Sequence, residues 1–370
     1  MTSRQRLLAV LRHGRADRLP WAPKFGTWLT AHALRGEVPA QLSGCATWHD
    51  AARRLGVDIF DKNGPVYREV FSSVKVIEET RGNLAVTRHL TPVGELRTVR
   101  EQVADYAHTV YLTEYPVKTP ADLRTWLYVL EDTRYEACYD EFLRADAEIG
   151  DDGITMTNLP DSPLHRVFVS LMGYETGSFA FADRPGEMAA LCARIMVKNE
   201  EAYALAMRSP AEVLLTGENT NSDFESPALF RSWAFPTFKR ASDLAHAAGK
   251  LHWVHACGKI RALLPRFLEA GIDGVESLTP PPYADTPLPE ARRAWNGSIT
   301  IDGGISPHVL VGDVSDAELE RSVRELLAGM GDGGNLVLSV SDDTPVDARI
   351  ERLQTIGQVV REIGRLPLRG

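Results

Sequence analysis

The chain has 370 residues, with 41 Lys and Arg against 50 Asp and Glu, a net charge of −9, and 44% hydrophobic residues. This composition is typical of globular proteins. At about 150 residues per domain, the length suggests two domains, unless the fold is a single α/β barrel. The basic residues are scattered rather than clustered, so the sequence argues against nucleic acid as a partner.

Membrane and secreted classes are also disfavoured. Apolar stretches such as Val213–Thr216 and Asn335–Val340 are far shorter than the roughly 20 residues of a membrane-spanning helix. The first residues lack the apolar stretch and cleavage site of a secretory signal. The four cysteines, at positions 45, 138, 192 and 257, contain no CxxC pair and do not suggest a disulfide framework. We therefore expect a cytoplasmic protein without a membrane partner.

Residues 1–110 are expected to form an extension of the main body. Ser3–His13 carries Leu and Val at helical spacing and predicts a short helix. From Val74 to Arg100, runs of β-forming residues are separated by the turn sequences Arg81-Gly82-Asn83 and Thr91-Pro92-Val93-Gly94. This pattern predicts a small antiparallel meander.

After Thr119-Pro120, which predicts a helix N-terminus, strands and helices alternate. The predicted strands are Gly153–Asn158, Glu212–Thr216, Leu251–Ala256, Asp273–Leu278, Ser298–Asp302 and Leu336–Ser341. The predicted helices are Pro185–Arg208, Pro227–Ala248, Ile260–Ala270, Asp316–Met330 and Val346–Ile363. With Leu55–Phe60 as an early strand, the number of strands approaches eight.

This alternation indicates parallel strands joined by helical crossovers. No GxGxxG follows the first strand and no GxxxxGK[ST] occurs, which disfavours a doubly wound nucleotide-binding sheet. We therefore predict one α/β domain over residues 1–370, a (β/α)8 TIM barrel with an N-terminal helical and antiparallel β extension.

Function in such a barrel is located at the carboxyl ends of the strands. One predicted strand ends in His255-Ala256-Cys257-Gly258. His255 and Cys257 are two residues apart on a strand and therefore point to the same face. An imidazole and a thiolate at one point form half of a zinc site. The alternative is a buried histidine beside an inert thiol.

Other strands also end in polar residues. Glu218 follows the preceding strand, where a carboxylate is either a third zinc ligand or a general base. The remaining candidates, for substrate binding, are Asn158, Asn219, Asn221, Glu276, Asp302, Ser339 and Asp342. Helix capping and ion pairing are the alternatives for these residues. No GxSxG motif is present, which disfavours serine hydrolysis.

The sequence resembles the uroporphyrinogen decarboxylase superfamily, whose members include zinc-dependent methyltransferases that work with corrinoid proteins. The resemblance covers nearly the whole chain. It rests on Arg6 with Asp17-Arg18-Leu19-Pro20, Gly56-Val57-Asp58, His255-Ala256-Cys257-Gly258, Gly271-Ile272-Asp273-Gly274 and Thr344-Pro345. The resemblance implies a (β/α)8 barrel, in agreement with the alternating strands and helices.

Two departures from the family patterns bear on the activity. True porphyrinogen decarboxylases carry an arginine-rich loop after their first strand, whereas Trp21–Trp28 contains no arginine. The methyltransferase branch has His-x-Cys and a later cysteine before a Thr-Pro pair, whereas Leu336–Asp343 contains no cysteine. The chain therefore looks more like the demethylase-type members, in which a glutamate matching Glu218 would supply the missing ligand.

The residues themselves also favour Glu218 as the third ligand. The last predicted strand offers only serines and aspartates, and serine is a poor zinc ligand. Glu218 ends the strand that precedes the His255 strand, and consecutive parallel strands are expected to be neighbours. We predict a His255–Cys257–Glu218 zinc site with an open fourth position, and Asp342 is the second choice for the third ligand.

The predicted function is a zinc-dependent methyltransferase with Glu218, His255 and Cys257 as its catalytic residues. It would move a methyl group between a small methyl ether, amine or thiol and a corrinoid (cobalamin) carried by a partner protein. A homodimer is the assembly to test. The alternatives are a metal-free lyase that decarboxylates an aromatic or pyrrolic acid, and a non-catalytic barrel that binds a partner.

Overall fold

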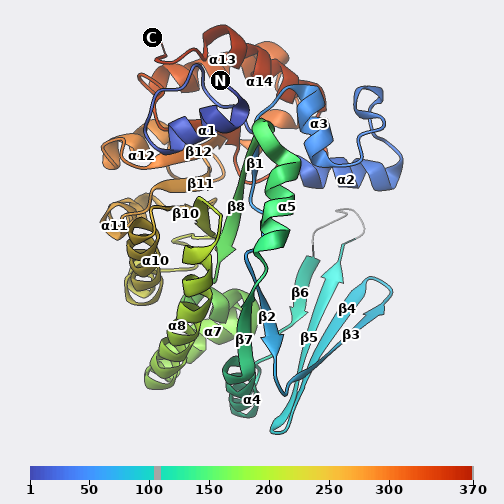
Figure 1. The fold of residues 1–370 in the computed structure, drawn as a ribbon, viewed down its shortest axis with the longest axis vertical. Coiled ribbons are helices and arrows are strands. Elements are labelled where there is room, and N and C mark those ends of the chain that lie inside the picture. Colours follow the sequence, from blue (N-terminus) through green and yellow to red (C-terminus); the bar gives the residue numbers. More distant parts are fainter. Residues whose placement is uncertain (104–109, 369–370) are drawn as a thin grey trace.

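The computed structural model describes residues 1–103 and 110–368. Its main body is a curled parallel sheet of seven strands in the order β1-β8-β9-β10-β11-β12-β13 (Figure 1). These strands are β1 (Ile59–Asp61), β8 (Gly153–Leu159), β9 (Val213–Thr216), β10 (Leu251–His255), β11 (Gly274–Leu278), β12 (Thr300–Ile305) and β13 (Leu336–Val340). Nearly all of their residues are buried, as expected for a parallel sheet covered by helices.

Six of these strands lie where the sequence predicts them, but the early strand differs. The prediction of a strand over Leu55–Phe60 is wrong in its first half, because Trp48–Leu55 forms helix α3. Thr47 and Asp50 cap the start of this helix, and Gly56 ends it in the left-handed conformation at φ 67°. Strand β1 therefore begins only at Ile59.

Residues 20–22 lie between the two edge strands of the curled sheet. Leu338 N–H donates to Pro20 O at 3.0 Å, and Ala22 N–H donates back to Leu338 O at 2.9 Å. On the other side, Asp58 N–H donates to Trp21 O at 2.8 Å. The segment forms a single bridge to β13 rather than an eighth strand. The predicted closed eight-stranded barrel is therefore not confirmed, and the described structure is a seven-stranded sheet of the same α/β type.

The helices pack around the parallel sheet, except that the helix over residues 120–132 packs against the antiparallel strands (Figure 1). They are α1 (Ser3–Leu11), α2 (Gly26–Arg35), α3 (Trp48–Leu55), α4 (Pro120–Asp132), α5 (Tyr139–Ile149), α6 (Pro163–His165), α7 (Tyr174–Asp183), α8 (Pro185–Arg208), α9 (Pro227–Leu229), α10 (Phe235–Ala247), α11 (Leu264–Ala270), α12 (Leu288–Ala294), α13 (Asp316–Gly329) and α14 (Ile350–Ile363). The largest apolar cluster, which includes Trp28, Phe267 and Trp295, lies between sheet and helices. None of these helices is both long and apolar enough to span a bilayer.

The predicted meander is present as an antiparallel sheet in the order β3-β4-β5-β6, beside a two-stranded sheet of β2 and β7. Its strands are β2 (Tyr67–Phe71), β3 (Lys75–Arg81), β4 (Leu84–Thr91), β5 (Gly94–Gln102), β6 (Val110–Glu114) and β7 (Thr133–Ala137). Strand β8 points toward this antiparallel part (Figure 1). The carboxyl ends of the parallel strands, where the predicted site residues lie, therefore face it. The division of the chain at residue 110 stays a prediction.

Candidate metal centre

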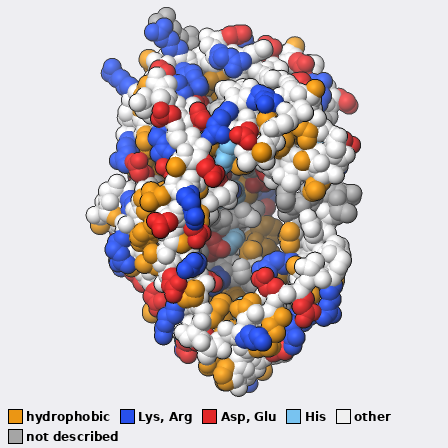
Figure 2. Space-filling model, turned by 45° about the vertical axis from the view of Figure 1, so that its right-hand side comes forward, with side chains coloured by type: hydrophobic (Ala, Val, Ile, Leu, Met, Phe, Trp, Pro, Cys, Tyr) orange, Lys and Arg blue, Asp and Glu red, His pale blue; other side chains and the backbone are white. Residues whose placement is uncertain are grey.

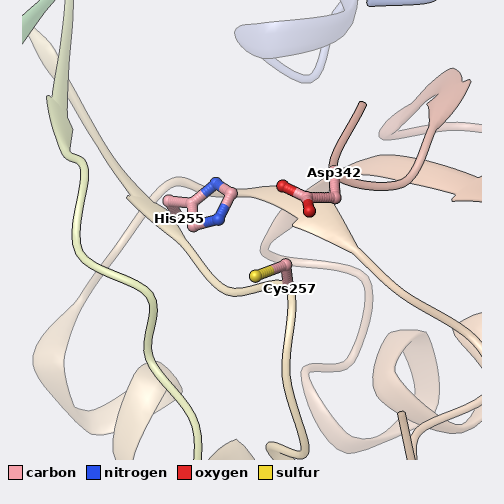
Figure 3. Close-up of side chains that lie close together, drawn as sticks. All are labelled: His255, Cys257 and Asp342. Atoms are coloured by element: carbon pink, nitrogen blue, oxygen red, sulfur yellow. The ribbon is translucent and has the colours of Figure 1, made fainter. Parts of the chain in front are cut away.

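Three predicted site residues converge at the carboxyl ends of β10 and β13. The imidazole of His255, the thiol of Cys257 and the carboxylate of Asp342 each place a ligand atom within 4.8 Å of the other two. Their side chains point toward one another from two segments of the chain (Figure 3). His255 is buried and Cys257 is partly exposed, so the group lies at the edge between the interior and solvent.

The third member of the group is Asp342, the second choice from the sequence, and not Glu218. Strand β9 pairs with β10 so that Thr216 lies opposite Val254. The two strands are neighbours, as the prediction requires. The Glu218 carboxylate, however, accepts a hydrogen bond from the Ser162 N–H, and among the described residues it is not one of the groups that converge with His255 and Cys257.

Asp342 reaches the group from the turn that follows β13. Its backbone is left-handed at φ 67°, a conformation that aspartate tolerates better than most residues. Strand β13 is the third neighbour of β10 in the sheet order. The curl of the sheet is therefore what brings Asp342 back toward His255.

Glu276 holds the His255 ring from the neighbouring strand. The two residues are register partners across β10 and β11, and His255 Nδ1 and Glu276 Oε2 form a very short hydrogen bond. Burial of the imidazole opposes its protonated form, but the Glu276 charge raises the pKa of His255 to about 9. With Nδ1 bonded to a carboxylate, Nε2 is the ring nitrogen available to a metal.

Lys24 in turn neutralises Glu276. Its Nζ donates to Glu276 Oε1 in a short ion pair, to Ser277 Oγ at 2.5 Å and to Asp302 Oδ2 at 3.1 Å. Although burial opposes ionisation, Lys24 and His255 hold the pKa of Glu276 well below its usual value. Burial raises the pKa of Asp302, which Lys24 only partly offsets. The predicted residues Glu276 and Asp302 therefore support His255 through one buried network.

A cavity of about 650 Å³ adjoins this centre, and we call it the central cavity. Its lining includes Lys24, Asp61, Lys62, Asp342 and Asp343. His255 and Cys257 are not among its lining residues, so the cavity meets the three-residue group at Asp342. The space-filling view shows the molecule hollowed at the centre of one face, with acidic and basic side chains around the hollow (Figure 2).

Glu218 belongs to a separate group, the Glu218 cluster, which consists of the buried residues His165, Glu218 and Glu225 and the partly exposed Asp161. Glu218 Oε2 accepts the Ser162 N–H at 2.7 Å. The His165 ring lies 3.8 Å from both Asp161 and Glu225. Burial, and then the charge of Glu225, raises the pKa of Glu218 to about 8. Burial opposes the charge on His165, but its three acidic neighbours raise its pKa to about 9.

The other predicted residues have structural contacts. Asn219 Oδ1 accepts a 3.9 Å hydrogen bond from Cys257 Sγ and so lies at the centre. Asn158 donates to Lys62 O at 2.9 Å. Asn221 Oδ1 accepts N–H groups of its own loop and of Lys259, at 3.0 and 3.3 Å. Ser339 Oγ donates to Ala22 O at 2.8 Å, which ties β13 to the N-terminal segment.

Lys24, His165 and Glu225 are not among the residues predicted from the sequence. Lys24 follows residues 20–22, which bridge to β13. This bridge brings the Lys24 side chain to Glu276 of β11 and Asp302 of β12. A lysine in an apolar segment between Trp21 and Phe25 was a signal of a buried ion pair. His165 and Glu225 follow the ends of β8 and β9, where polar residues of a barrel are expected to meet.

Comparison with known proteins gives a family and a fold. The sequence pattern of the family described as Uroporphyrinogen decarboxylase (URO-D) matches residues 109–363. A solved structure, described as a methyltransferase from Methanosarcina mazei, is similar over 98% of this chain and 99% of that chain, with a TM-score of 0.63 and 13% sequence identity. No curated protein matches the sequence. Because the family match covers more than half of its length, the chain belongs to the uroporphyrinogen decarboxylase (URO-D) family.

Proposed function

We propose that this chain is a zinc-dependent methyltransferase whose metal is held by His255, Cys257 and Asp342. The observation that carries the proposal is the convergence of these three side chains within 4.8 Å. One nitrogen, one sulfur and one oxygen ligand form a set that zinc accepts, with a fourth position left for substrate. The carboxylate–imidazole pair of Glu276 and His255 is the supporting interaction that metal-bound histidines usually make.

A bound zinc ion would supply Lewis acidity toward the donor heteroatom or would favour the thiolate form of an acceptor. The chain's own residues orient and shield the reacting groups. Glu276 fixes the orientation of the His255 ring, and Lys24 keeps Glu276 ionised. The central cavity, about 650 Å³ in volume, has the size of a small-molecule site. It would hold a methyl ether, amine or thiol against Asp342.

We propose a corrinoid protein as the second reactant. Figure 2 shows a hollow at the centre of one face of the molecule, which would give a large partner a place to approach. The carboxyl ends of the parallel strands, where Cys257 and Asp342 lie, are the functional edge of this type of fold. The methyltransferase of Methanosarcina mazei has the same fold over nearly its whole length, which supports methyl transfer as the activity to test.

The charges at the site favour methyl transfer over decarboxylation. Asp61, Asp342 and Asp343 line the central cavity. Of its two lysines, Lys24 is paired with Glu276 and Asp302, and Lys62 lies 3.8 Å from Glu276. A pyrrolic acid with several carboxylates would meet this acidic lining with few cations to neutralise it. A small neutral methyl donor has no such penalty.

The activity is tested with methylcobalamin as methyl donor and 2-mercaptoethanol as acceptor, by following the loss of methylcobalamin absorbance. We expect turnover by zinc-loaded protein, and loss of turnover after chelation and in Cys257→Ser. Cys138→Ser, which changes a thiol far from the centre in the sequence and outside the three-residue group, is the matched control and should retain activity. Turnover that is the same in chelator and in Cys257→Ser would overturn the proposal.

A further inference from the structure

A second cavity, of about 420 Å³, lies between the antiparallel sheets and helix α4. We call it the distal cavity. Its lining comes from β2, β4, β5 and β7, from α4, and from the segment that follows β8. Its volume falls in the range of small-molecule binding sites. It shares no lining residue with the central cavity, so it is a separate site.

Strand alternation builds the lining. Tyr67, Glu69 and Phe71 are alternate residues of β2, and Leu96, Thr98 and Arg100 are alternate residues of β5; all six line the distal cavity. Alternate residues of a strand share one face. One face of β2 and one face of β5 therefore line this cavity, and each face carries both apolar and polar side chains.

Aromatic rings form much of the wall. The Tyr67 and Tyr135 rings meet edge to face with their centroids 5.5 Å apart. The buried Trp126 ring lies under the Arg166 guanidinium at 5.5 Å. Rings in these orientations expose both edges and faces to the cavity. A planar aromatic ligand could therefore pack against them edge to face or in an offset stack, the two arrangements that aromatic pairs favour. The chemistry of the wall therefore matches a flat aromatic ligand.

Among the described residues, the charges of the lining are paired with one exception. Glu69 accepts the Tyr135 hydroxyl at 3.3 Å and lies 3.9 Å from Arg166. Asp161 lies 3.8 Å from His165. For Arg100, by contrast, no hydrogen bond or ion pair of the guanidinium is found within residues 1–103 and 110–368. It is the uncommitted cation of the cavity among the described residues.

His89 does not add a second charge. Burial lowers the pKa of its imidazole below the usual value; the charge of Glu69 opposes this shift, and Arg100 reinforces it. The ring also packs edge to face on Phe71, with the centroids 5.9 Å apart. One free guanidinium matches one carboxylate or similar single anion, whereas a polyphosphate would require more cations.

We propose that the distal cavity is a binding site for an aromatic acid, a planar ring that bears one carboxylate, with Arg100 pairing the carboxylate and the Tyr67, Tyr135 and Trp126 rings enclosing the ring. The site does not depend on the proposed methyl transfer. A smaller cavity of about 300 Å³ shares Leu159 and Asp161 with it and shares Lys62 and Asn63 with the central cavity. A ligand in the distal cavity thus lies at one end of a row of cavities that leads to the metal centre.

The test is the binding of 2-naphthoate to the full-length protein, measured by isothermal titration calorimetry. Two related probes define the chemistry: 2-naphthalenemethanol lacks the charge, and cyclohexanecarboxylate lacks the planar ring. We expect saturable binding of 2-naphthoate and at least about tenfold weaker binding of both other probes, the loss typical of one charged hydrogen bond. Equal binding of all three probes, or no binding of 2-naphthoate, would overturn the proposal.

Variants then locate the site. Arg100→Gln should weaken 2-naphthoate binding by about tenfold or more. Arg97→Gln is the matched control, since Arg97 lies on the same strand out of phase with the lining and pairs with Glu114. Unchanged binding in Arg100→Gln, with its melting temperature equal to that of the wild type, would contradict the proposal. Cys257→Ser should bind 2-naphthoate normally, so a failure of the methyl-transfer proposal leaves this result unaffected.

Discussion

His255 and Glu276 are register partners on adjacent parallel strands, and their side chains share a very short hydrogen bond on the inner side of the sheet. Direct pairing of this kind fixes both the position and the rotation of the imidazole. Lys24 fixes the carboxylate from the other side. The chain thus has a pre-oriented ring nitrogen at the point where Cys257 and Asp342 converge.

Replacing Glu276 should weaken metal binding without removing a ligand. Glu276→Gln keeps a hydrogen-bond acceptor for His255 but loses the charge. We expect zinc affinity to fall by about 10- to 100-fold, the usual effect of losing such a support. Competition with a chromophoric chelator measures this change. Glu290→Gln, at an exposed ion pair with Arg261, should leave zinc affinity unchanged. Equal affinity of Glu276→Gln and wild type would show that the pair does not support a metal ligand.

Asp342 and Glu218 are distinguished by their effects on zinc content. Asp342→Asn should reduce zinc affinity, and Asp342→Cys should restore or exceed it, because thiolate is a strong zinc ligand. Glu218→Gln should retain one zinc per chain, since Glu218 contacts Ser162 rather than the metal group. Elemental analysis after dialysis gives the answer. Loss of zinc in Glu218→Gln with retention in Asp342→Asn would restore the prediction made from the sequence.

Lys24 should be important for stability as well as for the site. Lys24→Met would leave two buried carboxylates, Glu276 and Asp302, without their common cation. We expect a loss of about 3–5 kcal/mol in the free energy of unfolding, as for one partner removed from a buried ion pair. Urea denaturation measures it. Lys118→Met, at an exposed pair with Glu114, should change stability by no more than about 1 kcal/mol. Similar losses in the two variants would contradict a buried network.

The Glu218 cluster should make stability fall as pH rises. The folded chain keeps a proton on Glu218 up to a pKa of about 8, whereas the unfolded chain releases it near 4.5. The stabilisation is therefore full below pH 4.5 and is lost as pH rises through 8. His165 acts in the same direction: its stabilisation is full below pH 6.5 and is lost through its folded pKa of about 9.

Glu218→Gln should flatten this pH dependence. The amide keeps an oxygen for the Ser162 N–H but carries no charge at any pH. Relative to the wild type, we expect the variant to gain about 1–3 kcal/mol between pH 5.5 and pH 9. Urea unfolding at the two pH values measures the difference. Glu212→Gln, at an exposed pair with Arg12, should leave the dependence unchanged. Parallel curves for Glu218→Gln and wild type would refute the assignment.

Local sequence patterns were sufficient to predict much of the fold and the shared face of two of the three residues of the candidate centre. The alternation of strands and helices predicted six of the parallel strands. The two-residue spacing of His255 and Cys257 predicted that they share a face, because strand periodicity is a local property. The strand predicted over Leu55–Phe60 begins too early, because Leu55 is the last residue of the capped helix Trp48–Leu55.

The third member of the group and the residues that support His255 depend on register and curvature, which the sequence does not reveal locally. Whether Glu218 faces His255 depends on the pairing of Thr216 with Val254; a shift of one residue would reverse its direction. Asp342 comes near Cys257 only because the sheet curls. Lys24 reaches Glu276, 252 positions away in sequence, because residues 20–22 bridge to β13.

In the proposed centre, one nitrogen, one sulfur and carboxylate oxygen from this chain surround a zinc ion. Zinc K-edge X-ray absorption of the purified, zinc-loaded protein tests it most directly. We predict one sulfur scatterer at about 2.3 Å with nitrogen and oxygen scatterers at about 2.0–2.2 Å, and two sulfur scatterers in Asp342→Cys. A spectrum without a sulfur scatterer, or one that Cys257→Ser leaves unchanged, would contradict the claim.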